Sequence, residues 1–197
     1  MQWNPRMSKK IYDVAIIGAG VVGTAIAREL SKHDISIAVL DAHSDVGDGT
    51  SKANTAILHT GFDMVPSSLE SKLVARGYHL LRDYARETGI AVEELGALLV
   101  AWSQEEHDNL AKLQAKAVEN GYKDSVLISA TDVYAREAHL GKGALGALYV
   151  PGEWIIDPWT PIVAFATQAK LAGADADEFT ILRDHVYTEE FIIKPLK

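Results

Sequence analysis

A glycine-rich turn at residues 18–23 constrains the fold of this chain more than any other feature. It follows the apolar, β-branched run 13–17 and opens residues 21–32, where apolar side chains recur at helical spacing. A second apolar run follows at 36–40. This succession predicts a βαβ unit whose first strand is buried on both faces of a parallel sheet. The apolar stripe expected on the helix comprises Val22, Ala25, Ile26 and Leu30.

The turn has the spacing of a dinucleotide-binding fingerprint, G-x-G-x-x-G. The first glycine permits a tight bend, the second lets the backbone approach a pyrophosphate, and the third lets the helix pack closely on the strand. Asp41 follows about 20 residues later, where a carboxylate can bind both ribose hydroxyls of an adenosine and repels a 2′-phosphate. The pattern predicts an adenine dinucleotide other than NADP and leaves FAD and NAD open. The candidate contacts are Gly18, Gly20, Val22, Gly23 and Asp41.

Helix caps and apolar runs organise the rest of the chain. A polar loop is expected at 42–52. Ser67 and Glu70 have the spacing of a capping box for a helix that reaches about Glu87 and stops at Gly89.

Further elements are expected beyond that helix. Residues 92–101 favour a strand region, and Ser103 with Glu106 predicts a helix that ends at Asn120 and Gly121. The remaining predictions are strands at 126–128 and 147–150, a brief helix from Asp132, and a helix opened by Asp157 and Pro158.

Composition excludes several classes of function. The 27 acidic residues outnumber the 19 Lys and Arg, and the net charge of −8 argues against nucleic-acid binding. Because there is no cysteine, disulfides and thiolate metal sites are excluded, and a cytoplasmic location is expected. No apolar run approaches the roughly 20 residues of a membrane-spanning helix, although peripheral membrane association stays compatible with the sequence. The histidines lack ligand spacing, so no metal is expected.

The choice between FAD and NAD as the predicted cofactor depends on a resemblance in residues 49–63. The stretch Gly-Thr-Ser-Lys-Ala-Asn-Thr-Ala-Ile-Leu-His-Thr-Gly-Phe-Asp closely resembles the segment after the second strand in the D-amino-acid oxidase-like superfamily of FAD enzymes. Within it, the chain is most similar to the branch of FAD-dependent glycerol-3-phosphate dehydrogenase and L-2-hydroxyglutarate dehydrogenase. The resemblance extends through 66–77, 119–121 and 152–158, and covers 13 to about 174. It implies FAD as the cofactor.

The resemblance also implies roles for individual residues. Residues 50–54 would wrap the pyrophosphate and ribityl portion of the flavin, which makes Thr50, Ser51 and Asn54 candidate cofactor contacts. His59 lies in the stretch that approaches the isoalloxazine ring, where a histidine can take a proton as hydride leaves the substrate. The alternative is a packed, hydrogen-bonded histidine with no catalytic step.

The expected fold class is α/β: an FAD/NAD(P)-binding Rossmann-type βαβ domain with part of an interleaved α+β substrate domain. After residue 174 the sequence departs from the family, which favours a truncated chain and leaves an internal deletion open. The predicted organisation is an extension at 1–10, a Rossmann-type portion at 11–94, substrate-domain elements at 95–157, a returning helix at 158–174 and an atypical tail at 175–197.

The function implied by these features is hydride transfer to FAD from a CH–OH donor such as glycerol 3-phosphate or a 2-hydroxy acid. The expected partner is a small-molecule substrate, and the electron acceptor is left open. One alternative is a non-catalytic, truncated remnant of such an enzyme. Another is an NAD-dependent dehydrogenase.

Overall fold

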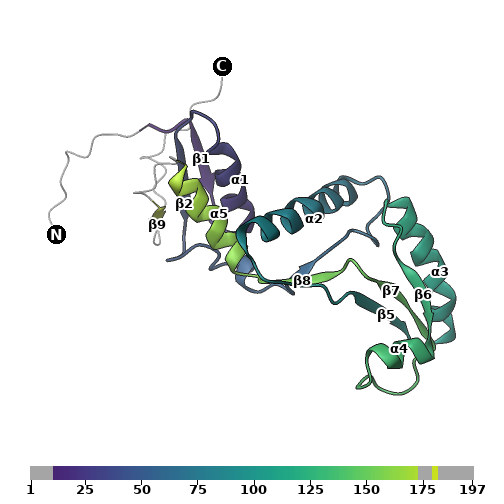
Figure 1. Cartoon of the computed structure of the whole chain (residues 1–197). Helices are drawn as coiled ribbons and strands as arrows, with labels where there is room; N and C mark the ends of the chain where they lie inside the picture. The colour runs from purple at the N-terminus through teal and green to yellow at the C-terminus, as the bar shows by residue number, and fades with distance from the viewer. Residues whose placement is uncertain (1–10, 173–178, 182–197) are drawn as a thin grey trace. The chain divides into compact units, whose positions relative to one another are not determined.

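The computed structural model describes residues 11–172 and 179–181 of the 197-residue chain. The chain divides into two compact units, Met1–Asn54 with Pro158–Lys197, and Thr55–Asp157. We call them the first unit and the second unit; most of their elements are labelled in Figure 1. The predicted extension at 1–10, and the predicted tail apart from 179–181, lie outside the described residues.

The division differs from the domain boundary expected at 94/95. The sequence assigned the whole of 11–94 to the Rossmann-type portion, whereas the structure places the residues from Thr55 onward in the second unit. The reason is a short strand that the sequence did not predict, β3 (Ile57–Leu58), which pairs with β8 (Trp154–Ile156) of that unit.

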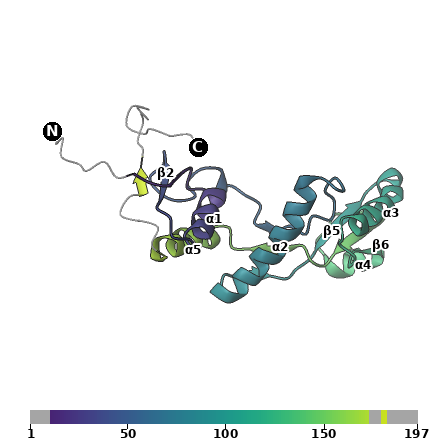
Figure 2. The same cartoon turned by 90° about the horizontal axis from the view of Figure 1, so that it is seen from above.

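A parallel sheet forms the first unit. Its strands are β1 (Val14–Ile17), β2 (Ile37–Asp41) and β9 (Phe179–Ile181), in the order β1-β2-β9. The helix α1 (Val21–Leu30) joins β1 to β2, which confirms the predicted βαβ unit. The helix α5 (Thr160–Leu171) lies beside α1 in both views (Figures 1 and 2).

The core of the first unit uses a different helix face from the predicted one. Ile17 of β1 is 84% exposed, so the predicted double burial is wrong. Val22 and Ile26 of α1 are 69% and 44% exposed, so the predicted apolar stripe is wrong at these two positions, whereas Leu30 packs against the core. Instead α1 is buried through Thr24 and Ala27, whose small side chains allow close packing. Helical spacing identified the element but not the face that its neighbours cover. The buried core cluster comprises Ile16, Ala19, Ala27, Ile37, Val39 and Ala169.

The second unit contains two antiparallel sheets. In the first, β8 lies between β3 and β4 (Val92–Glu93). The helix α2 (Leu69–Thr88) contacts β3. These short strands connect the beginning of the unit to its end.

The second sheet of this unit has the order β5-β7-β6 and a helix on each face. Its strands are β5 (Ala97–Ala101), β7 (Gly146–Val150) and β6 (Val126–Ser129), and its helices are α3 (Gln104–Glu119) and α4 (Ala130–Arg136). Side chains alternate between the faces of a strand. Leu148 and Val150 accordingly pack with α3, whereas Ala147 packs with α4.

Two helices begin earlier or later than the sequence predicts. The cap of α2 is Ser68, which accepts a hydrogen bond from the amide of Ser71 at 3.0 Å. The expected cap, Ser67, has φ of 64° and therefore lacks the extended backbone of an N-cap. For α4, Ser129 is the cap and Asp132 is its capping-box partner, not the first residue.

The start of α5 is also shifted. Asp157 and Pro158 were expected to open the helix, but the amide of Asp157 donates to the carbonyl of Ala91 at 3.0 Å. Asp157 is therefore bound to the segment just before β4 and lies outside the helix. The helix is capped by Trp159 and carries Pro161 in its first turn, where a missing amide proton costs nothing.

Other predicted boundaries are confirmed. Ser103 and Glu106 form the capping box of α3, and Asn120 caps the end of that helix. Gly89 ends α2 in the left-handed conformation.

The strand region predicted over 92–101 is interrupted at Gly96, whose φ of 75° breaks it into β4 and β5.

Candidate functional site

The glycine turn is closed by direct backbone contact. Gly18 has φ of 102°, in the left-handed region that glycine tolerates best. A Cβ atom on Gly23 would lie 1.8 Å from the carbonyl oxygen of Gly18. The helix can therefore approach the end of β1 this closely only when residue 23 has no side chain.

The N-terminus of α1 has the properties of an anion site. Its cap, Gly20, supplies no side-chain hydrogen bond, and the first turn contains no acidic residue. The amide of Val21 donates to Ser51 Oγ at 3.0 Å. Because helix N-termini carry partial positive charge, this end of α1 attracts a negatively charged group.

Asp41 lies directly against the glycine turn. Its Oδ2 accepts a hydrogen bond from the amide of Ala19 at 2.5 Å, and its Oδ1 accepts one from the amide of His43 at 2.8 Å. Burial opposes ionisation, but these amides and the His43 ring outweigh it and hold the pKa of Asp41 below its ordinary value. A carboxylate is thus fixed in ionised form beside the turn.

The loop after β2 places Ser51, another candidate cofactor contact, at the start of α1. It contains a short 3-10 helix, η1 (Thr50–Lys52), and Ser51 of η1 is the residue that meets Val21. Asn54 supports the loop by donating from Nδ2 to the carbonyl of Ser51 at 2.7 Å. Thr50 is exposed, and Lys52 forms an ion pair with Asp48.

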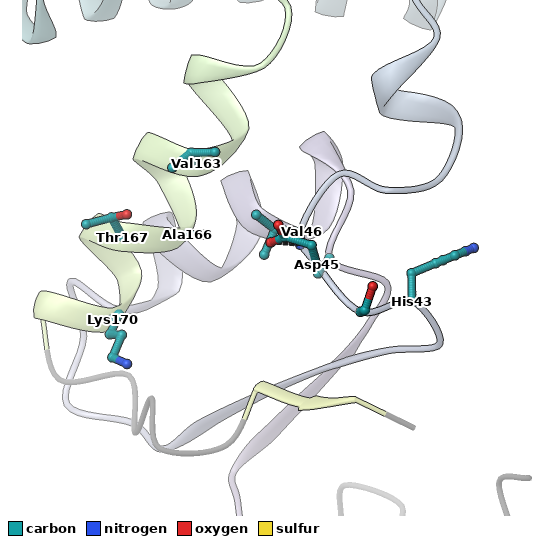
Figure 3. Close-up of a pocket in the computed structure, with 9 residues that line it drawn as sticks. His43, Asp45, Val46, Val163, Ala166, Thr167 and Lys170 are labelled. Carbon is teal, nitrogen blue, oxygen red and sulfur yellow. Dashed lines mark hydrogen bonds between the residues drawn. The ribbon is translucent and has the colours of Figure 1, made fainter. Parts of the chain in front are cut away.

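A pocket of about 280 Å³ lies between α5 and the loop that follows Asp41 (Figure 3). The sequence did not predict it because its two walls come from distant parts of the chain. Ala19 of the glycine turn also lines it. The remaining lining residues are His43, Ser44, Asp45, Val46, Val163, Ala166, Thr167 and Lys170.

In the second unit, His59 lies directly after β3 and contacts several neighbouring groups. Its Nδ1 accepts a hydrogen bond from the amide of Gly61 at 2.8 Å, and its ring stacks on Phe62 with centroids 5.8 Å apart. Asp63 Oδ1 lies 3.4 Å from Nε2, and Glu153 Oε1 lies 3.6 Å from Nδ1. The side chain is 34% exposed, so it is packed yet reachable.

Glu153 is a buried carboxylate that the sequence analysis missed. It is 5% exposed, and its Oε1 accepts hydrogen bonds from the amide and the hydroxyl of Thr60 at 2.7 and 2.6 Å. The available signal was a single acidic residue inside the apolar segment 152–156. Charged residues are almost never buried without a partner.

Neighbouring side chains fix the turn that follows His59 and the segment that carries Glu153. Asn120 donates from Nδ2 to the carbonyls of Phe62 and Met64 at 3.1 and 2.8 Å. Tyr122 accepts a hydrogen bond from the amide of Gly152 at 2.7 Å. Burial raises the pKa of the Tyr122 hydroxyl to about 12, so it stays neutral near pH 7.

Residues 11–172 and 179–181 contain no group of three or more His, Asp or Glu side chains that could hold a metal ion. In this same part of the chain, no helix has the length and apolar character needed to cross a membrane.

Comparison with known proteins defines the class. The sequence model of the DAO family, described as FAD dependent oxidoreductase, matches residues 13–182. The chain belongs to this family of FAD-dependent oxidoreductases, which confirms the resemblance and the α/β class predicted from sequence.

Two curated relatives match this chain over most of its length. It is 38% identical to a glycerol 3-phosphate dehydrogenase of Caloramator mitchellensis over 84% of its length, and 35% identical to the mitochondrial L-2-hydroxyglutarate dehydrogenase of Dictyostelium discoideum over 76%. The chain spans 34% of the length of each of these relatives.

Two solved structures are also similar to this chain. An L-alpha-glycerophosphate oxidase from Mycoplasma pneumoniae with FAD bound superimposes with a TM-score of 0.78 at 27% identity, over 83% of this chain and 43% of that one. A glycine oxidase from Geobacillus kaustophilus has a TM-score of 0.74 at 29% identity, over 82% of this chain and 45% of that one.

Proposed function

We propose that the first unit holds the ADP half of FAD. The observation that carries this proposal is the 2.5 Å hydrogen bond from the amide of Ala19 to Asp41, which sets a carboxylate beside the glycine turn. Gly18 and Gly49 have open space where a Cβ would project, so a diphosphate can approach the backbone there. The diphosphate would lie at the start of α1, in contact with Gly18, Gly20, Val22 and Gly23.

The adenosine would lie beyond the diphosphate. Asp41 is the group that can accept a hydrogen bond from a ribose hydroxyl, because its Oδ2 accepts from the Ala19 amide and keeps a second lone pair. The adjoining pocket suits the adenine ring, since aliphatic side chains of Val46, Val163 and Ala166 form part of its walls. Thr50, Ser51 and Asn54 would face the pyrophosphate and ribityl portion of the cofactor.

The proposed reaction is oxidation of a CH–OH carbon in a small molecule such as glycerol 3-phosphate or a 2-hydroxy acid. This donor class is supported by the relatives, which are named for glycerol 3-phosphate and L-2-hydroxyglutarate. FAD, when bound, supplies the acceptor for the hydride. His59 would take the hydroxyl proton, so that the donor loses one hydride and one proton and becomes a carbonyl compound.

The first test is flavin binding. The full chain, purified and supplied with excess FAD, is expected to show the absorption of bound oxidised flavin and to bleach anaerobically with sn-glycerol 3-phosphate or L-2-hydroxyglutarate. Asp41→Asn should weaken FAD binding about 10- to 100-fold, because a charge-assisted hydrogen bond is lost. Titration calorimetry measures the affinity.

The matched control is Asp34→Asn, which removes the same charge from an exposed turn of the first unit. It should bind FAD like the wild type. Equal affinity of the Asp41 and Asp34 variants would contradict the proposed site, and tighter binding of NAD than of FAD would contradict the cofactor. Flavin binding without bleaching by either donor would support the non-catalytic alternative.

A further inference from the structure

The side chain of Asn120 joins three segments of the second unit. Its Nδ2 donates to the carbonyls of Phe62 and Met64 at 3.1 and 2.8 Å, and its Oδ1 accepts a hydrogen bond from the hydroxyl of Ser71 in α2 at 2.9 Å. An asparagine amide has two N–H donors, and here both bind the same turn of backbone. The sequence predicts Asn120 only as the end of α3, which does not account for these contacts.

The end of α3 does not need this side chain. The amides of Asn120 and Gly121 donate to the carbonyls of Lys116 and Val118 at 2.9 and 3.0 Å, so backbone hydrogen bonds complete the last turn. Asn120 has φ of −76° and ψ of 0°, a conformation that most residue types adopt. The side-chain amide is therefore available for a second task, which its partners define.

The turn that Asn120 binds also supplies contacts to the His59 ring. The amide of Gly61 donates to His59 Nδ1 at 2.8 Å, and the ring stacks on Phe62 with the two planes 13° apart. Phe62 is 3% exposed and belongs to a core cluster that includes residues of α3. The orientation of the imidazole thus depends on where the backbone places Gly61 and Phe62.

This turn lies close against α2. A Cβ atom on Gly61, whose φ is 82°, would lie 3.3 Å from the Val74 side chain of that helix. The Asn120 amide, which is bound to Ser71 of the same helix, ties the turn to this place. Because carbonyl oxygens only accept hydrogen bonds, the group that faces those of the turn must be a donor, and a carboxylate there would repel them.

We propose that Asn120 is a positioning residue for His59: its amide holds the carbonyls of Phe62 and Met64 and thereby fixes the turn that orients the imidazole. Asn120 itself contacts neither the donor nor FAD in this proposal and acts through the turn alone. This inference rests on the proposed role of His59.

The sharpest test is Asn120→Asp, because aspartate keeps the size of the side chain while its ionised carboxylate only accepts hydrogen bonds. The readout is the set of ring NMR signals of His59, recorded on the full chain without FAD or substrate and assigned with His59→Asn. These signals are expected to shift, because loss of the two hydrogen bonds moves the imidazole relative to the Phe62 ring.

The matched control is Asn109→Asp, which makes the same change at an exposed position of the same helix. Its His59 signals should coincide with those of the wild type. A destabilised Asn120→Asp protein with unchanged His59 signals would overturn the proposal, since the residue would then serve stability alone.

Ser71→Ala tests the same contact from the other side. It removes the hydroxyl that binds Asn120 Oδ1 and leaves the turn itself unaltered, so the His59 signals should shift in the same direction by a smaller amount. The backbone amide of Ser71 bonds to the cap Ser68, so α2 should stay capped. This variant decides the matter if Asn120→Asp folds poorly, and wild-type His59 signals in it would then contradict the proposal.

Turnover separates this inference from the function beneath it. With sn-glycerol 3-phosphate or L-2-hydroxyglutarate as the probe, Asn120→Asp should lower kcat about 10- to 100-fold and leave KM nearly unchanged, because a misplaced base slows the chemical step. FAD affinity should equal that of the wild type, since the proposed cofactor contacts lie in the first unit. A normal kcat in this variant, with loss of turnover in His59→Asn, would reject only the role of Asn120. Full turnover in His59→Asn would reject the proposed base itself.

Discussion

Two glycines illustrate how differently the same residue type acts in this chain. At Gly23 an added methyl group would collide with the backbone oxygen of Gly18, which cannot move without opening the turn. At Gly77, inside α2, a Cβ would meet nothing within 4 Å. The first glycine is required by packing, whereas the second only lowers the helix propensity of its surroundings.

Alanine substitutions should therefore have opposite effects on stability. Gly77→Ala is expected to raise the free energy of unfolding by about 0.5–1 kcal/mol, because alanine favours the helix and restricts the unfolded chain. Gly23→Ala should lower it by at least about 2 kcal/mol through overpacking. Urea denaturation followed by circular dichroism measures both, and a Gly23→Ala protein as stable as the wild type would refute the packing argument.

The site residues differ in whether a local sequence pattern could predict them. Gly18, Gly23 and Asp41 stand at a spacing that one βαβ unit imposes, so their sequence pattern predicts their proximity. Glu153 lies 93 positions from Thr60, its hydrogen-bond donor, and no local pattern joins the two. Its importance became visible only when the fold buried it next to His59.

At the scale of elements, the start of α2 shows why a correct helix can have a wrong first residue. Ser67 and Ser68 each have a potential capping partner three residues later. The backbone decides between them, because an N-cap needs an extended conformation and Ser67 is left-handed. Sequence pattern predicted the existence of the helices well, but not the conformation of single residues before them.

Substitution of the two serines distinguishes the alternatives. Ser68→Ala should cost about 1 kcal/mol, because the amide of Ser71 loses its acceptor. Ser67→Gly should leave stability unchanged or raise it by about 0.5 kcal/mol, since glycine accepts a positive φ. Thermal unfolding compares them, and equal losses in both variants would show that Ser67 takes part in the cap.

At the scale of the whole chain, the two units differ in how they are encoded. The second unit is one continuous segment, and its ends are joined because Ile57 pairs with Ile155 and the amide of Ile156 donates to Ala56. The first unit is discontinuous, and α1 packs on α5 from the far side of the insertion. The α/β class followed from local patterns, whereas this interleaving depends on pairings between distant residues.

Residues 55–157 are therefore expected to fold when expressed alone, since their hydrophobic clusters and both sheets are internal. The measurement is a dispersed amide NMR spectrum together with a single cooperative urea transition. Residues 11–54 alone should stay unfolded, because Ala169 and the rest of α5 are needed for their core. A collapsed, poorly dispersed spectrum for 55–157 would show that the segment depends on the first unit.

The pairing of β3 with β8 also bears on how such proteins diversify. Since the inserted segment begins and ends in strands that bond to one another, a foreign segment could be grafted at the same two junctions if its own ends met in the same way. Recombination there would exchange the His59 environment as a cassette and leave the glycine turn untouched. Selection could then change the donor that is oxidised while the dinucleotide-binding turn stayed the same.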